Sequence, residues 1–158
     1  MTRRSFSTST IGRRFRNVAD FQLDPAFVAT SHKVADLPLC EVRLQDDARY
    51  PWLVLIPRQS GLREIEALDV AHRIQLVEEI VLAGTAVRAV GSALGLAVEK
   101  LNVGALGNVT AQLHVHIVGR RADDPAWPSP VWGHSAATTY SAEDLAEPIA
   151  AARGALKL

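Results

Sequence analysis

Residues 69–94 carry the strongest periodic pattern in the chain and limit its possible folds more than any other segment. One apolar stripe holds Val70, Ile74, Val77 and Val81, and the stripe beside it holds Leu76, Ile80, Val87 and Leu94. The polar residues fall on the opposite side: Gln75, Glu78, Glu79 and Thr85. An apolar arc this wide predicts a helix that packs on a sheet and is compatible with a second subunit. Gly91 and Gly95 predict its end.

Short β-like segments flank this helix on both sides. Residues 39–44 and 52–57 are apolar runs joined by a polar connection, and residues 100–106 and 111–118 are β-like around a predicted Gly107-Asn108 turn. Both pairs are expected to be antiparallel. Residues 24–31 predict a short helix, and the pair Ser141 and Asp144 predicts a C-terminal helix over 141–157. The fold class is therefore α+β, with an antiparallel sheet, one long helix and short terminal helices.

Composition excludes several classes of partner. The 17 basic and 17 acidic residues cancel, so no net charge attracts a nucleic acid or an anionic membrane. Cys40 is the single cysteine, which excludes an internal disulfide and a cysteine zinc site and fits a reducing compartment. No apolar run approaches the roughly 20 residues that span a bilayer. We expect a cytoplasmic protein that binds neither nucleic acid nor membrane.

The first 20 residues differ from the rest of the chain. They are rich in arginine, serine and threonine and contain no acidic residue before Asp20. This composition is typical of a mitochondrial transit peptide, which would direct the protein to the matrix. The alternative is a flexible N-terminal extension, residues 1–20, or a start codon assigned too early. We expect the remainder, residues 21–158, to form one domain.

Two histidines alternate with aliphatic residues in the segment QLHVHIVGR. In a strand, Gln112, His114 and His116 would share one face. The Cβ atoms of the two histidines would lie roughly 6 to 7 Å apart, twice the rise per residue. Three interpretations follow. The pair could be solvent-facing surface histidines, it could supply two metal ligands with a third from elsewhere, or one neutral imidazole could attack phosphorus.

The chain from Asn102 to Arg120 resembles the histidine triad (HIT) family. That family has a strand of three alternating histidines, preceded by an Asn-containing strand and a Gly-Gln turn and followed by Pro or Gly and an Arg. The corresponding residues here are Asn102, Gly107-Asn108, Gln112, His114, His116 and Gly119-Arg120. The segment WLVLIPR, residues 52–58, is similar to the family's strand that ends in Pro and a basic residue. The resemblance spans residues 35–121.

This resemblance implies a nucleotide-binding hydrolase or nucleotidyl transferase that forms a covalent nucleotidyl-His114 intermediate. The substrate would be a phosphoanhydride or phosphoramidate of a nucleotide, such as a dinucleoside polyphosphate, and the resemblance requires no metal or other cofactor. His116 would be the second catalytic residue, and a homodimer is expected. Further substrate-binding residues, expected from the resemblance or from their chemistry, are Gln112, Asn102, Gly107, Asn108, Arg120, Trp127 and Trp132. The two tryptophans lie in a Trp/Pro loop, residues 122–134.

Several positions depart from the family pattern. Gln112 replaces the first histidine, and Trp52 and Ser60 stand where the family often has two others. Val109 stands where a hydroxyl is common, although Thr110 is adjacent. Glutamine forms hydrogen bonds but does not titrate. Two alternatives therefore remain open at the sequence level: a non-catalytic nucleotide-binding protein, and a histidine metal-binding protein.

Overall fold

The computed structural model describes residues 20–157. The expectations for residues 1–19 lie outside this range. Five strands form one sheet in the order β1-β2-β3-β5-β4, and every neighbouring pair is antiparallel. The strands are β1 (Ser31–Asp36), β2 (Cys40–Gln45), β3 (Trp52–Pro57), β4 (Lys100–Gly104) and β5 (Val115–Arg120). This arrangement confirms the α+β fold class.

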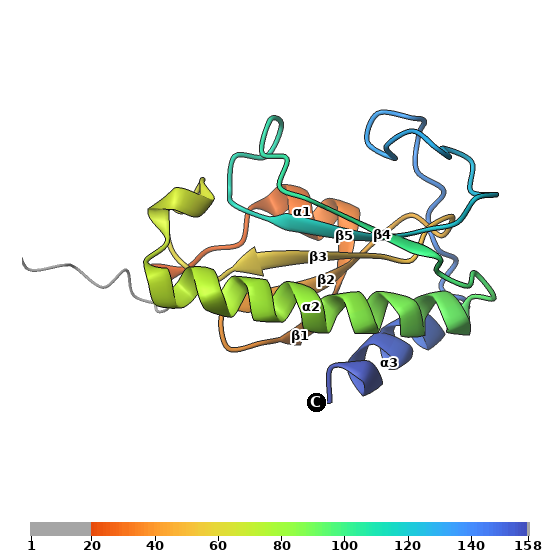
Figure 1. The fold of residues 1–158 in the computed structure, drawn as a ribbon, viewed down its shortest axis with the longest axis horizontal. Helices are drawn as coiled ribbons and strands as arrows, with labels where there is room; N and C mark the ends of the chain where they lie inside the picture. Colours follow the sequence, from red (N-terminus) through yellow and green to blue (C-terminus); the bar gives the residue numbers. More distant parts are fainter. Residues whose placement is uncertain (1–19, 158) are drawn as a thin grey trace, which may run out of the picture.

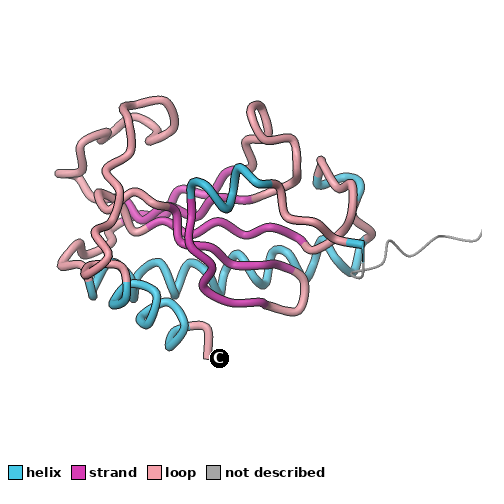
Figure 2. Tube along the Cα trace, turned by 180° about the vertical axis from the view of Figure 1, so that it is seen from behind, coloured by secondary structure: helices cyan, strands magenta, loops and turns pink. Residues whose placement is uncertain are grey.

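The helices cover the two faces of the sheet unequally. They are α1 (Pro25–Thr30), the short 3₁₀ helix η2 (Ile65–Ala67), α2 (Val70–Ala93) and α3 (Ala146–Ala155). Figure 1 shows α2 across one face of the sheet with α3 beside it, and the view from behind in Figure 2 shows α1 on the other face. None of the described helices has both the length and the apolar character needed to cross a bilayer.

Each face of the sheet has its own apolar cluster. The larger cluster joins α2 and α3 to the sheet through residues such as Leu55, Val87 and Ile117. The smaller cluster, on the other face, is formed by Phe27 of α1, the β3 side chains Trp52, Val54 and Ile56, and residues of the Trp/Pro loop. The Trp/Pro loop is therefore packed on the sheet, since its residues Ala126 and Val131 are buried.

Helix α2 has the predicted length, and of its two predicted apolar stripes the one that holds Leu76 and Val87 packs on the sheet. Asp69 caps its first turn by accepting a hydrogen bond from the His72 amide, and Gly95 adopts a positive φ of 68° just beyond its end. The sheet-facing side is built from Leu76 and smaller residues, whereas the stripe of Val70, Ile74, Val77 and Val81 is exposed. Glu79, predicted on the polar side, is buried because its carboxylate accepts hydrogen bonds from the Leu39 and Cys40 amides.

One strand was not predicted, and two further elements begin later than predicted. Strand β1 was not predicted, because the sequence SHKVAD lacks an apolar run. The last predicted strand, residues 111–118, instead begins at Val115 and ends at Arg120. The C-terminal helix begins at Ala146, not at Ser141, although Ser141 and Asp144 do form reciprocal hydrogen bonds. The later start places Pro148 in the first helical turn, where a missing N–H leaves no hydrogen bond unmade.

Gly119 sets the distance between β5 and α2. A side chain at this position would place its Cβ 2.6 Å from a Val98 methyl carbon and 3.0 Å from one of Val87. The Gly119 amide also donates to the carbonyl of Pro51 over 2.7 Å, which holds β5 against the start of β3. Glycine therefore permits the close contact that fixes the end of the histidine-bearing strand.

Candidate active site

A cavity of about 430 Å³ lies at the face of the sheet that carries the smaller apolar cluster. Its walls come from segments far apart in the sequence: β3, the loop between β4 and β5, and the Trp/Pro loop. The residues that line it include Trp52, Asn108, Thr110, His114, His116 and Trp132. The cavity thus combines aromatic surface with two imidazoles, a combination suited to a ligand with a flat ring and a polar group.

His114 lies immediately before β5 and has one ring nitrogen fixed by the backbone. Its Nδ1 is 2.7 Å from the carbonyl oxygen of Gln112. A carbonyl only accepts hydrogen bonds, so Nδ1 carries the proton and Nε2 of the neutral ring carries the lone pair. Within the part of the chain that the structure describes, Nε2 of His114 makes no hydrogen bond. This tautomer leaves Nε2 available as a nucleophile.

His116 is held in the opposite tautomer. The indole Nε1 of Trp52 donates a 3.0 Å hydrogen bond to His116 Nδ1, and an indole N–H can only donate. Nδ1 of His116 is therefore unprotonated, and Nε2 carries the proton. Burial, together with the neighbouring His114, lowers the pKa of His116 to about 3. His116 is thus a neutral hydrogen-bond donor at physiological pH.

Aromatic rings surround both imidazoles. The centroids of His114 and His116 are 4.8 Å apart with an interplanar angle of 82°. Phe27 of α1 contacts His114 edge to face at 4.9 Å, and Trp132 contacts His116 at 5.7 Å. His114 and His116 are only 5% and 9% exposed, so each ring has little freedom to reorient. The sequence pattern that paired the two histidines thus corresponds to rings in direct contact.

His114 also borders a second, smaller cavity of about 210 Å³. This cavity is lined by the segment 63–66, by Ala105 and Gly107 of the loop between β4 and β5, and by Leu113. The backbone just before His114 is fixed, because the Leu113 amide donates a hydrogen bond to the Leu62 carbonyl over 2.9 Å. One imidazole therefore contributes to the walls of two separate cavities.

Comparison with known proteins identifies the family of this chain. Residues 26–123 match the HIT domain family. The fold is similar to a histidine triad protein of Sinorhizobium meliloti, 35% identical, with a TM-score of 0.79 over 87% of this chain and 98% of that one. The chain belongs to the histidine triad family. A histidine triad protein of Bradyrhizobium japonicum is similar at 38% identity and a TM-score of 0.79, over 86% of this chain and 98% of that one.

Histidine triad proteins include nucleotide-binding hydrolases and transferases. A more distant structure, described as a hypothetical histidine triad nucleotide-binding protein of Sulfolobus tokodaii, is 15% identical and covers 84% of this chain and 89% of its own. Its TM-score of 0.59 shows a shared fold alone. No curated protein matches the chain at a significant level.

The structure brings some of the predicted histidine triad site residues together and separates others. Asn108 and Trp132 line the larger cavity with the two histidines, and Gly107 lines the smaller one. Gln112 lines neither cavity. Its amide oxygen accepts from the Asp24 amide, and its amide nitrogen donates to the Gln22 carbonyl, each over 2.9 Å.

Arg120, Asn102 and Trp127 form a separate group at the far end of β5. The Arg120 guanidinium is buried and donates to both carboxylate oxygens of Asp124, to Asn102 Oδ1 and to the Ser129 carbonyl. The Trp127 ring lies 5.7 Å from the guanidinium carbon. All of these contacts join the Trp/Pro loop to the sheet, and none of the three side chains lines the cavity. A further arginine, Arg49, is paired with Asp47 at 2.7 Å.

Two residues of this site carried no signal that singled them out in the sequence. In the sequence, Trp52 was noted only because it stands where the family often has a histidine. In the structure, its indole fixes the tautomer of His116. Phe27 appeared only as an apolar residue of a short helix, yet its ring covers His114. Both contacts join segments more than 60 residues apart, which short-range patterns do not reveal. Among residues 20–157, no group of three His, Cys, Asp or Glu side chains is arranged to hold a metal ion.

Proposed function

We propose that this protein hydrolyses or transfers the nucleotidyl group of a small nucleotide conjugate, with His114 as the nucleophile. The observation that carries the proposal is the pair of opposite tautomers next to one cavity. His114 offers a lone pair on Nε2, because its Nδ1–H is bound by the Gln112 carbonyl. His116 offers an N–H, because Trp52 occupies its Nδ1. One nucleophile and one neutral donor side by side suit attack on an anionic phosphate.

In the proposed first step, Nε2 of His114 attacks the phosphorus that bears the nucleoside. A bond forms between nitrogen and phosphorus while the bond from phosphorus to the leaving group breaks, and the leaving group departs with the electron pair. A polyphosphate departs as an anion, whereas an amine takes a proton from water. Water then attacks the nucleotidyl-His114 phosphorus, the bond to Nε2 breaks, and a proton goes to solvent. The imidazole supplies the nucleophile itself, so neither step requires a metal.

The remaining side chains have roles that follow from their positions. His116 Nε2–H would donate to a phosphate or bridging oxygen, since its pKa of about 3 keeps it neutral and its N–H available. The aromatic wall formed by Trp52 and Trp132 would stack on the nucleobase, with ring centroids 6.0 Å apart. Asn108 and Thr110, at the rim between β4 and β5, would hold ribose or phosphate oxygens. The substrate class is dinucleoside polyphosphates or nucleoside phosphoramidates.

Product release from defined substrates tests this proposal. Wild-type and His114→Asn protein are incubated with a panel of dinucleoside polyphosphates and adenosine phosphoramidates in the presence of a chelator, and released AMP is measured by chromatography. We expect release by the wild type and at least about a 10³-fold lower rate for His114→Asn, because the nucleophile is lost. His134→Asn, which changes an exposed histidine that does not line the cavity, is the matched control.

The same experiment separates the alternatives. Tight AMP binding by both proteins with release by neither would show a nucleotide-binding protein without turnover. Release that stops on addition of chelator and returns with a metal would show a metal-dependent reaction instead. Full release by His114→Asn would exclude His114 as the nucleophile.

We also propose that two copies of the chain associate through α2 and β4. The stripe of Val70, Ile74, Val77 and Val81 on α2 is 56–65% exposed, and Val103 on β4 is 51% exposed. Strand β4 is an edge of the sheet and contacts α2, since Leu101 packs at Gly84. An exposed apolar stripe beside an unpaired strand edge is suited to a second copy related by two-fold symmetry.

A further inference from the structure

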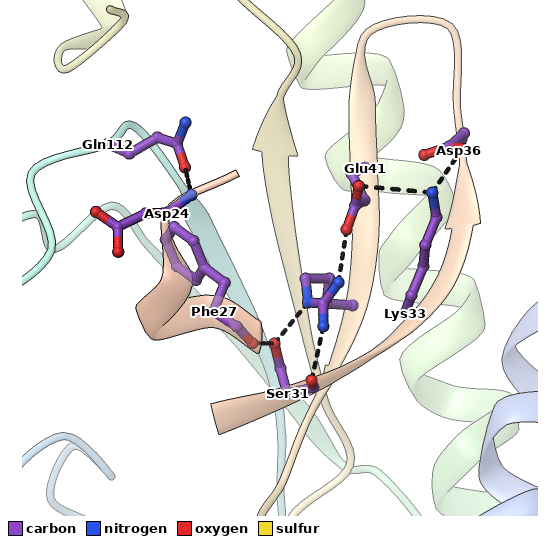
Figure 3. A network of polar contacts seen from close by, with 8 residues as sticks. Asp24, Phe27, Ser31, Lys33, Asp36, Glu41 and Gln112 are labelled. Carbon is purple, nitrogen blue, oxygen red and sulfur yellow. Dashed lines mark hydrogen bonds and ion pairs between the residues drawn. The ribbon is translucent and has the colours of Figure 1, made fainter. Parts of the chain in front are cut away.

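The amide of Gln112 binds the backbone segment that leads into α1 through both its oxygen and its nitrogen. Its Oε1 accepts from the Asp24 amide and its Nε2 donates to the Gln22 carbonyl, both over 2.9 Å (Figure 3 shows the first contact). Gln22 and Asp24 are 90 and 88 residues away along the chain. A primary amide can accept from one backbone group through its oxygen and donate to another through its nitrogen, and glutamine provides it with enough reach.

The other end of α1 is fixed by a buried polar network, drawn in Figure 3. The Ser31 hydroxyl donates to the Phe27 carbonyl and accepts from Arg43 Nε at 2.8 Å. Arg43 also donates to the Ser31 carbonyl and pairs with Glu41 at 2.6 Å. A helix of six residues is not stable by itself, so the position of α1 depends on these contacts, on those of Gln112 and on the packing of Phe27 in the smaller apolar cluster.

Helix α1 places Phe27 directly on the proposed nucleophile. The Phe27 ring is 5% exposed, and its centroid is 4.9 Å from that of His114. On its other sides His114 contacts the His116 ring and the Gln112 carbonyl. The imidazole is therefore held by three neighbours, and Gln112 contributes to two of them: its carbonyl binds Nδ1, and its side chain anchors the helix that carries Phe27.

We propose that Gln112 is a positioning residue, whose amide clamps the start of α1 and thereby holds Phe27 against His114. The glutamine at the first triad position thus acts on the nucleophile through Phe27. Gln112 is absent from both cavities that His114 borders, so its side chain affects the orientation of His114 more than the affinity for nucleotide. The activity readout rests on the proposed function, whereas the structural readout below does not.

A double-mutant cycle tests this coupling. Gln112→Met keeps the volume of the side chain and removes both hydrogen bonds, and Phe27→Leu removes the ring contact. We expect each variant to lower kcat about tenfold while KM changes less than about twofold, because a displaced nucleophile slows attack without removing a ligand contact. The double variant should be no slower than Phe27→Leu alone. Gln59→Met, a glutamine outside the network, is the matched control and should behave as wild type.

Additive losses in the double variant, or a rise in KM with kcat unchanged, would overturn the proposal.

An NMR measurement without substrate covers the case in which the wild type shows no turnover. In ¹⁵N-labelled wild type the Nδ1–H of His114 should give a downfield resonance protected from solvent exchange, because it is bound to the Gln112 carbonyl. In Gln112→Met and Phe27→Leu we expect this resonance to exchange at least about tenfold faster. Unchanged exchange in Gln112→Met would refute the clamp whatever the activity.

Discussion

The two histidines of this site differ in chemistry because different neighbours occupy their Nδ1 atoms. A backbone carbonyl requires the proton on Nδ1 of His114, and an indole N–H requires its absence on Nδ1 of His116. Burial favours the neutral form of His116 further, since a cation there would lose its hydration. His116 is therefore a neutral donor, and the neutral form of His114 has its lone pair on Nε2.

The low pKa of His116 predicts a pH dependence of stability. The pKa is about 3 in the folded protein and about 6.5 in an unfolded chain. The contribution of neutral His116 to the free energy of unfolding is complete above pH 6.5. It is lost as the pH falls toward 3, because His116 then binds a proton in the unfolded state and not in the folded state. Between pH 7 and 4.5 we expect the free energy of unfolding to fall by roughly 2 kcal/mol on account of His116.

Urea unfolding of wild type and His116→Gln at both pH values measures this contribution. The variant should lack that part of the pH dependence, and His134→Gln, which changes an exposed histidine, controls for the loss of a histidine. An identical pH dependence in wild type and His116→Gln would refute the assignment.

At the residue scale the sequence predicted that His114 and His116 lie side by side. It did not predict their tautomers or the position of the His114 ring. Alternation in QLHVHIVGR is a local pattern, and it places His114 and His116 together. The tautomers depend on Trp52 and on the carbonyl of Gln112, and the ring position of His114 depends on Phe27. These contacts are set by strand pairing and by the path of residues 20–30, which local patterns do not encode.

The Trp/Pro loop is an irregular element whose position depends on one buried ion pair. Arg120 Nε and Asp124 Oδ2 are 2.7 Å apart, and their side chains are 1% and 2% exposed. Burial raises the pKa of Asp124, but hydrogen bonds from Arg120 and from the backbone outweigh burial and lower it overall. The loop carries Trp132 into the larger cavity, so the ion pair at the end of β5 supports the site indirectly.

Asp124→Asn should therefore destabilise the protein by about 3 kcal/mol, because it leaves the buried Arg120 without a counter-charge. Chemical unfolding, followed by tryptophan fluorescence, measures the change. The matched control is Asp123→Asn, which removes an exposed carboxylate paired with Arg121 and should leave stability close to wild type. Equal stability of both variants would contradict a role for the ion pair in holding the loop.

At the element scale, periodicity predicted the long helix and the pair β2 and β3, and missed β1. Strand β1 was missed because four of its six residues are polar or charged and only Ser31 and Val34 are buried. On α2, the predicted stripe of Leu76 and Val87 packs on the sheet. Small side chains that hydropathy does not single out, such as Ala83 and Ala86, complete this contact, because close packing on a sheet favours them. Glu79 is buried because it binds backbone amides, a tertiary contact.

At the scale of the whole molecule, the exposed face of α2 predicts self-association. We expect the wild type to sediment as a dimer, and the double variant Val77→Lys, Val81→Lys to raise the dimer dissociation constant by about 100-fold or more, since an ammonium group is costly to bury. Val28→Lys, at a valine that is 62% exposed on α1, is the control and should remain dimeric. A monomeric wild type at all concentrations would contradict the proposed interface.

The motif that resembles the histidine triad family contains residues of two kinds, and the tight contact at Gly119 is an example of the structural kind. Gly119 serves helix packing, and Arg120 locks the Trp/Pro loop through Asp124. Neither contact depends on turnover, so both would persist in a relative that had lost activity. In the proposed function, by contrast, His114 and His116 carry the chemistry. A sequence search weighted on the Gly-Arg pair would therefore recover shared architecture, and one weighted on the two histidines would collect candidates for the proposed reactivity.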